Sequence, residues 1–134
     1  MIQGRGGKKI DVVIPFHISS LSDTPQLMRL SSDTSAAHTN YLNRYRTNLH
    51  FTEMVVVQDD DAGGGETYTL RIYLNGVLSQ TETLTSGTAN TPVLKTLSSL
   101  YSVTLGDIIS MDIKSSNTTA GDEIILHLYG YYLS

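Results

Sequence analysis

Residues 66–74 alternate almost perfectly between two kinds of side chain. One face takes Tyr68, Leu70, Ile72 and Leu74, and the other takes Thr67, Thr69, Arg71 and Tyr73. A period of two is typical of a half-buried β-strand. Asn75-Gly76 comes next, ahead of a second strand-like run over residues 77–84, and this dipeptide readily adopts the positive φ angles of a two-residue type I′ turn. The sequence therefore predicts a β-hairpin from residue 66 to residue 84.

Other short segments that are rich in apolar and β-branched residues also have the character of strands. They cover residues 10–18, 26–31, 51–58, 92–97, 102–105, 108–114 and 123–133. Pro15 has no N–H to donate to a ladder, so we expect the first segment to be an edge strand or to contain a bulge. For residues 35–48 we favour a strand or irregular structure, although a helix would place Tyr41, Leu42 and Tyr45 on one face. About seven or eight strands, spaced by about ten residues and with no long helix, predict a sandwich or a barrel.

The chain has the size of one domain. Its 134 residues are enough for one sandwich core and too few for two. Residues 1–9 contain three glycines and three basic side chains, so we predict a flexible basic N-terminal arm followed by a single β-sandwich domain over residues 10–134. Only 16% of the residues are charged, compared with about 25% in a typical soluble domain. A surface that is short of charge is often partly covered.

Composition also argues against several classes of function. The net charge of −4 argues against nucleic acid as a partner, because phosphates are neutralised by clustered Lys and Arg. The absence of cysteine excludes disulfides and thiolate metal sites. We expect no membrane span, because no apolar run approaches about 18 residues, and no secretory signal in residues 1–9.

The last predicted strand is apolar on both faces. Ile124, Leu126 and Leu128 alternate with Ile125, His127 and Tyr129, and then come Tyr131, Tyr132 and Leu133. One sheet face needs only one core, so the second face must be covered by another element or by another subunit. We favour another subunit.

A series of features runs through the chain from Met28 to Ser134. They are Tyr41-Leu-Asn-Arg-Tyr45, Met54-Val-Val-Val57, a Gly-rich tip, Leu74-Asn75-Gly76, a Ser/Thr-rich middle, Leu105-Gly-Asp-Ile-Ile109 and Gly121-Asp-Glu-Ile-Ile125. This order resembles a small jelly-roll module of bacteriophage virion proteins, found in capsid decoration or cement proteins, head fibres and tail-fibre or tail-spike tips.

A second resemblance is to the trimeric jelly rolls of the C1q and tumour-necrosis-factor families. It rests on the Gly106-Asp107 turn, the alternating strand after it, and Tyr129-Gly130-Tyr131-Tyr132. Both resemblances imply trimers built around aromatic and aliphatic strands, and neither is to a family of enzymes. The expected absence of a signal segment and of a collagen stalk favours the phage family.

The phage resemblance implies a jelly-roll-like antiparallel β-sandwich with an extended N-terminal arm. The implied function is a structural one without catalysis or cofactor: a homotrimeric decoration or cement subunit on the capsid surface of the virion, assembled in the host cytoplasm. Its partners would be the major capsid protein or other virion proteins. In this hypothesis Tyr129, Tyr131, Tyr132 and Leu133 form the oligomer interface, and Arg5, Lys8 and Lys9 of the arm contact the capsid. The alternative is a receptor-binding or glycan-binding tip of a phage fibre or spike.

Sites for ions or phosphate have weaker support from the sequence. Asp59-Asp60-Asp61 offers hard oxygen ligands for Ca²⁺, but its spacing does not match an Asp-x-Asp-x-Asp-Gly frame, and we favour a solvated hairpin tip. Residues 4–9 have glycines like a phosphate-binding loop, but no strand precedes them and no Lys-Ser/Thr pair follows. We therefore assign no metal site. Asn117-Thr118-Thr119 is a glycosylation sequon that matters only in a secretory setting.

A small sandwich hydrolase is the competing enzymatic hypothesis. It would need one histidine joined to a serine and a carboxylate, yet Gly-x-Ser-x-Gly is absent and nothing selects one serine. The four histidines are His17, His38, His50 and His127, and they lack metal-ligand spacing. The eight tyrosines suit either subunit contact, which we favour, or stacking on carbohydrate. They are Tyr41, Tyr45, Tyr68, Tyr73, Tyr101, Tyr129, Tyr131 and Tyr132.

Overall fold

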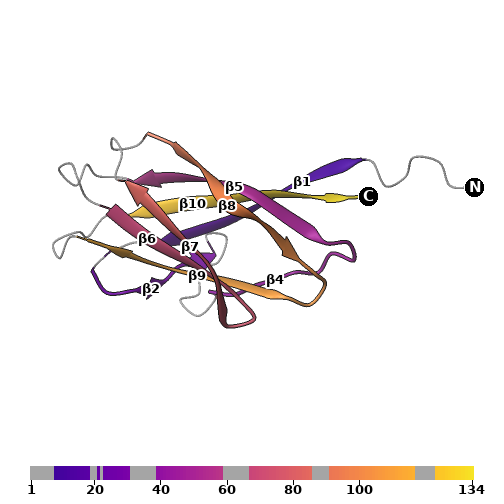
Figure 1. Cartoon of the computed structure of the whole chain (residues 1–134), viewed down its shortest axis with the longest axis horizontal. Coiled ribbons are helices and arrows are strands. Elements are labelled where there is room, and N and C mark those ends of the chain that lie inside the picture. Colours follow the sequence, from indigo (N-terminus) through magenta and orange to yellow (C-terminus); the bar gives the residue numbers. More distant parts are fainter. Residues whose placement is uncertain are drawn as a thin grey trace, which may run out of the picture.

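The computed structural model describes residues 8–18, 21, 23–30, 39–58, 67–85, 91–116 and 123–134, with the backbone alone for residues 85 and 98–101. These residues form two antiparallel sheets (Figure 1). Sheet A contains, in spatial order, β3 (Arg29–Leu30), β1 (Lys9–Ile18), β10 (Ile124–Leu133), β5 (Leu49–Gln58) and β8 (Val93–Val103). Sheet B contains β2 (Gln26–Leu27), β9 (Ile108–Ser115), β6 (Thr67–Leu74) and β7 (Val77–Thr85), and β4 (Tyr41–Leu42) also pairs with β9.

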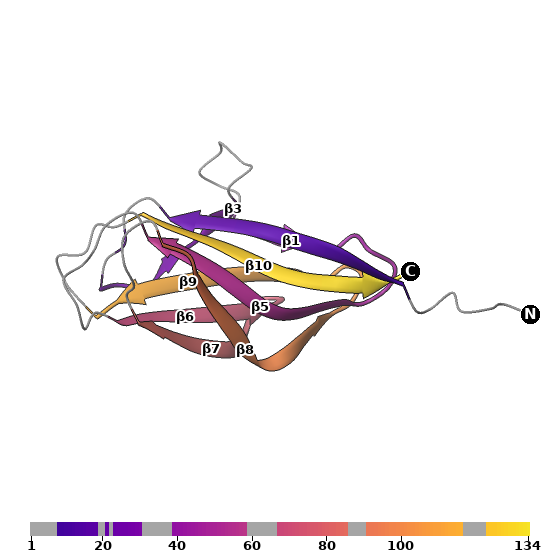
Figure 2. The same cartoon turned by 90° about the horizontal axis from the view of Figure 1, so that it is seen from above.

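The strand order is that of a jelly roll. Figure 2 shows β1, β10 and β5 in one layer and β9, β6 and β7 in the other. The chain changes sheet at most connections, and β6 and β7 are joined as a hairpin within one sheet. Wrapping the chain in this way brings its first long strand beside its last, with Lys9 opposite Leu133 and Ile18 opposite Ile124. The predicted jelly-roll-like antiparallel β-sandwich is confirmed.

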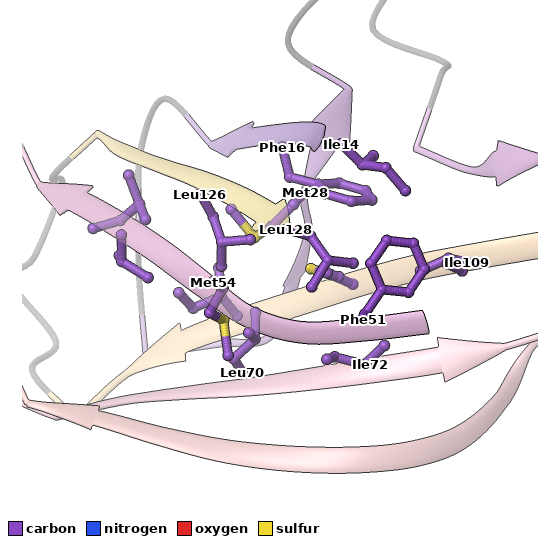
Figure 3. Close-up of a cluster of buried hydrophobic side chains, with 14 of the residues drawn as sticks. Ile14, Phe16, Met28, Phe51, Met54, Leu70, Ile72, Ile109, Leu126 and Leu128 are labelled. Atoms are coloured by element: carbon purple, nitrogen blue, oxygen red, sulfur yellow. The ribbon is translucent and has the colours of Figure 1, made fainter. Parts of the chain in front are cut away.

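Alternating side chains of the two sheets fill the space between them (Figure 3). Sheet A contributes Ile14, Phe16, Phe51, Met54, Leu126 and Leu128, and sheet B contributes Leu70, Ile72, Ile109, Met111 and Ile113, all fully or almost fully buried. Removing apolar surface from water stabilises a fold by about 25 cal/mol per Å². Because every second residue of each long strand points into this core, the face on which each remaining residue lies is fixed as well.

The predicted hairpin is present. The pattern of β6 alternates between buried and half-exposed residues, and Tyr68, Leu70 and Ile72 face the core. Asn75 has a φ of 52° and Gly76 a φ of 82°, the positive values that a type I′ turn requires. Residues 39–48, the described part of the segment for which we favoured a strand or irregular structure, contain only the two-residue strand β4.

Three segments differ from the simplest expectation or refine it. β1 pairs along its whole length with β10 without a bulge. On its other side, among the described residues, β3 pairs with it at Phe16 and His17, so Pro15 has no described ladder partner there. The segment predicted over residues 26–31 is split between the sheets: β2 belongs to sheet B and β3 to sheet A, with the fully buried Met28 between them. The segments predicted at 92–97 and 102–105 belong to one strand, β8, which pairs irregularly with β5.

Hydrogen bonds tie together the turns at the end of the sandwich where β1 begins and β10 ends. The Asn75 side chain donates to Asp107 Oδ1 over 2.9 Å and accepts from the N–H of Ile108 over 2.9 Å. Asn43 is fully buried, and its amide donates to the carbonyl oxygens of Val103 and Thr104 over 3.2 and 3.0 Å. We call these connected residues the turn network.

Candidate interaction surface

The outer face of sheet A is formed by the side chains that point away from the core. On β1 they are Lys9, Asp11, Val13, Pro15 and His17; on β10, Ile125, His127, Tyr129, Tyr131 and Leu133; on β5, His50, Glu53, Val55 and Val57; and on β8, Leu94 and Thr96. Its centre is mainly aliphatic and aromatic. No described element covers this surface, which we call face A: Val13 is 45% exposed, Ile125 38% and Leu94 61%.

Aromatic rings and one cation cluster at the end of face A near the start of β1. The rings of His50 and Tyr131 lie 5.3 Å apart between centroids, and those of His127 and Tyr129 lie 6.2 Å apart. Lys9 Nζ lies 4.4 Å from the centroid of the Tyr131 ring, which is a cation–π contact. The ring face of Tyr131 is therefore presented to a positive charge.

A groove of about 370 Å³ crosses the three central strands of face A. It is lined by Lys9, Asp11, Val13, Thr52, Glu53, Tyr129, Gly130 and Tyr131. The ladder places Tyr129 between Val13 and Glu53, and Tyr131 between Asp11 and His50. Two carboxylates thus flank two tyrosines, and this arrangement can hold a positively charged group by hydrogen bonds and by ring contact.

Gly130 lines this groove at a point where β10 lies close to β5. A Cβ atom at position 130 would overlap the backbone oxygen of His50 and lie 2.7 Å from Phe51 Cδ1. The β10–β5 register shifts between Tyr129 and Gly130, and the β5–β8 register shifts around Thr52. Such irregularities bend a strand and re-aim its side chains.

The residues predicted to form the oligomer interface divide between two faces. Tyr129, Tyr131 and Leu133 share face A. Tyr132 points to the other side of β10, where it packs against the core with its ring centroid 4.8 Å from that of Tyr45. Alternation along the strand makes this separation unavoidable once Leu126 and Leu128 face the core.

Of the predicted capsid-contacting residues, Arg5 lies outside the described residues. Lys8 is exposed, and its carbonyl oxygen accepts a 3.0 Å hydrogen bond from the N–H of Ser134, which extends the β1–β10 ladder by one step. Lys9 belongs to β1, with its ammonium group over Tyr131. The structure therefore places Lys9 in the sheet, whereas we had included it in the arm.

Three histidines that are distant in the sequence lie on face A. They are His17, His50 and His127, whereas His38 lies outside the described residues. The Nδ1 atoms of His17 and His50 are shielded from solvent and have no hydrogen-bond partner among the described residues. Sequence reasoning treated the histidines separately, although the alternation of each strand carried the signal that they share one face.

The remaining tyrosines have separate places. Tyr41 and Tyr45 line a hollow of about 440 Å³ together with Leu30, Asn40, Leu42 and Arg44. Burial raises the pKa of the Tyr41 phenol, the neighbouring Tyr45 adds to this, and Arg44 opposes it. Tyr68 is buried, with its hydroxyl donating to Gln58 Oε1 over 3.0 Å. The side chain of Tyr101 lies outside the described set.

The outer face of sheet B, face B, has a polar centre with its groups paired. Arg71 donates from Nε and from a terminal nitrogen to the two oxygens of Asp112, each over 2.8 Å, and the Tyr73 hydroxyl donates to Asp112 Oδ2 over 2.7 Å. The hydrogen bond to Asp112 raises the pKa of Tyr73, and burial adds to the effect. Exposed aliphatic side chains flank this cluster: Leu27 lies opposite Asp112, and Leu78 lies opposite Tyr73.

Within the described ranges, no group of three or more His, Cys, Asp or Glu side chains is placed to hold a metal ion. The calcium candidate Asp59-Asp60-Asp61 and the sequon at residues 117–119 lie outside those ranges. No helix among the described residues has the length and apolarity of a membrane span.

No protein-family model and no curated protein matches the chain. Two structures of infectious bursal disease virus, strains Gt and Gx, are each 14% identical, with TM-scores of 0.45 and 0.37 over 96% and 91% of this chain. Dimeric latent PorU from Porphyromonas gingivalis is 14% identical, with a TM-score of 0.35 over 93%.

This chain spans only 38%, 37% and 13% of the length of those three chains, respectively. Because every TM-score lies below 0.5, no functional argument rests on these similarities.

Proposed function

We propose that this protein is a structural subunit of a virion, and specifically a trimeric decoration or cement subunit of a bacteriophage capsid. The observation that carries the proposal is face A, a sheet surface that no described element covers and whose centre is aliphatic and aromatic. Val13, Val55, Ile125 and Tyr129 share this outer face, and a contiguous apolar patch of this kind is typical of a protein–protein contact.

The work of such a subunit is mechanical. Burial of face A against neighbouring chains removes apolar surface from water. Tyrosine suits the edge of such an interface, because its ring is apolar and its hydroxyl can bond to water. The loss of translational and rotational freedom offsets part of this gain, so several subunits must act together on one shell. Tyr129, Tyr131 and Leu133 belong to the interface in this proposal, whereas Tyr132 stabilises the fold. No reactive residue is needed.

The first test is the mass of the purified chain in solution, followed by co-sedimentation with undecorated shells of the source particle. We expect trimers that bind shells. A variant with Lys8→Gln should bind shells more weakly but remain trimeric, because Lys8 of the arm contacts the shell in this proposal. A monomer that ignores shells would exclude the proposal.

A glycan-binding fibre or spike tip is the second candidate. It is favoured by the hollow beside Tyr41 and Tyr45, where two phenol rings, Asn40 and Arg44 surround a space large enough for a sugar ring. Glycan-array binding that is lost in Tyr41→Ala, together with a protein that is indifferent to shells, would favour this candidate over the first.

A further inference from the structure

The groove on face A has the chemistry of a receptor for a cationic side chain. Asp11 and Glu53 supply two carboxylates, and Tyr129 and Tyr131 supply two rings between them. Lys9 Nζ already lies 4.4 Å from the centroid of the Tyr131 ring, which shows that one ring of the groove contacts a cation. Lys9 contacts the Tyr131 ring. The negative charge of Glu53, beside Tyr129, is therefore available to a second cationic group.

Residues 4–7, Gly-Arg-Gly-Gly, have the matching composition. Arg5 provides a guanidinium group, which pairs with carboxylates in a planar fork and stacks on aromatic rings. The glycines on both sides of it have no side chains, so the backbone can lie close to a shallow floor such as the one at Gly130. The charges are complementary, because the groove carries two carboxylates against one ammonium group.

The direction of β1 indicates whether this segment binds in the groove of its own copy or in that of an adjacent copy. β1 runs from Lys9 through Asp11 to Val13 along the groove, and the hydrogen bond between Ser134 and Lys8 continues the ladder in the opposite direction. At Lys8 and Lys9 the strand, followed towards the N-terminus, therefore points away from the groove of the same copy. Four residues span at most about 14 Å, so the segment reaches the groove of an adjacent copy packed against face A without a reversal.

We propose that residues 4–7 of one copy bind in the groove of a neighbouring copy, with the Arg5 guanidinium beside Tyr129 and between Asp11 and Glu53. This inference rests on the proposed self-association and adds to it the group that links one copy to the next. Lys8 then remains the basic residue of the arm that is available to the shell.

The absence of cysteine from the sequence allows a direct test by disulfide trapping. Full-length chains carrying Gly6→Cys are mixed with full-length chains carrying Thr52→Cys, oxidised mildly and examined on a non-reducing gel. We expect a covalent heterodimer, because Thr52 lines the groove and a disulfide forms only when the two Cα atoms come within about 7 Å. Asp23→Cys is the matched control: it is exposed, outside the groove, and should give at least tenfold less product.

Charge exchange supplies the second test. Arg5→Glu and Glu53→Arg should each weaken self-association about tenfold, and a chain carrying both substitutions should recover it, because each reversed arm then meets a reversed groove. Asp23→Asn should leave association unchanged.

The outcomes separate the inference from the function on which it rests. If the wild-type chain forms trimers but the Cys pair gives no heterodimer, the inference is wrong and the proposed function stands. If a chain carrying both Cys substitutions closes a disulfide within a monomer, the segment fills its own groove and the inference is again wrong. If the wild-type chain is monomeric at every concentration, both fail together.

Discussion

The two outer faces of this sandwich are built by the same alternation of residues but present opposite chemistry. At the centre of face B, Arg71, Tyr73 and Asp112 bond to one another, so their polar groups are satisfied within the chain. At the centre of face A, Val55 and Ile125 lie beside histidine and tyrosine rings, and no described element covers them. The polar centre of face B is thus paired within the chain, whereas face A is the surface that we propose for contact with another protein.

The strongest test of this comparison places the same charge on each face. Val55→Lys puts an ammonium group among His127 and Leu94 at the centre of face A, and we expect self-association to weaken roughly 100-fold because a buried unpaired charge costs several kcal/mol. Thr83→Lys on face B, where Thr83 is exposed opposite Thr69, should have no effect. Analytical ultracentrifugation measures both, and equal effects would remove the distinction between the faces.

A second test addresses the backbone that shapes face A. Gly130→Ala forces a Cβ atom against the backbone oxygen of His50 and the Phe51 ring, so we expect a loss of about 2–3 kcal/mol in the free energy of unfolding. Gly106→Ala is the control: Gly106 has a φ of +88° but open space around it, and the loss should be nearer 1 kcal/mol. Urea denaturation distinguishes the two, and a milder effect at Gly130 would contradict the close approach of β10 and β5.

A third test concerns the internal pairing of face B. The hydrogen bond from Tyr73 to Asp112 raises the pKa of the phenol, because loss of the proton would break the bond and place a second negative charge beside the carboxylate. Asp112→Asn should lower the pKa of Tyr73 towards its ordinary value, as followed by ultraviolet absorbance during an alkaline titration. If the titration is unchanged, the face B cluster is not formed in solution.

The smallest expected effect is at the turn network, which supports neither face directly. Hydrogen bonds from the side chain of Asn75 and from the backbone and hydroxyl of Thr104 lower the pKa of Asp107. A carboxylate whose folded-state pKa is depressed stabilises the fold above its unfolded pKa, near 4, and that contribution is lost as the pH falls through the folded value. Asp107→Asn should therefore flatten the pH dependence of stability below about pH 4, measured by thermal unfolding across that range, and an unchanged slope would contradict the network.

Local patterns predicted the elements in which neighbouring residues decide the structure. The alternation of β6 and the Asn75-Gly76 turn are local signals, and both are confirmed. The two apolar faces of β10 were also readable, since each residue of a strand faces one side or the other. The sequence therefore identified the strand that dominates face A.

Features that depend on distant partners were not readable in the same way. Nothing within residues 26–30 shows that β2 and β3 join different sheets, because that depends on β9 and β1. Glu82 is only 4% exposed, and its burial depends on Gln80, which donates to it over 2.6 Å, and on Lys95, 3.8 Å away on β8. The groove likewise forms only when β1, β10 and β5 are side by side.

The position of β10 also has a consequence for protein synthesis. Since β10 lies between β1 and β5, sheet A is divided into two unconnected parts until residues up to 133 have left the ribosome. A partly synthesised chain can therefore form the β6–β7 hairpin but not a complete face A. The surface that we assign to assembly thus exists only once β10 has been synthesised, so a chain that lacks β10 cannot present it.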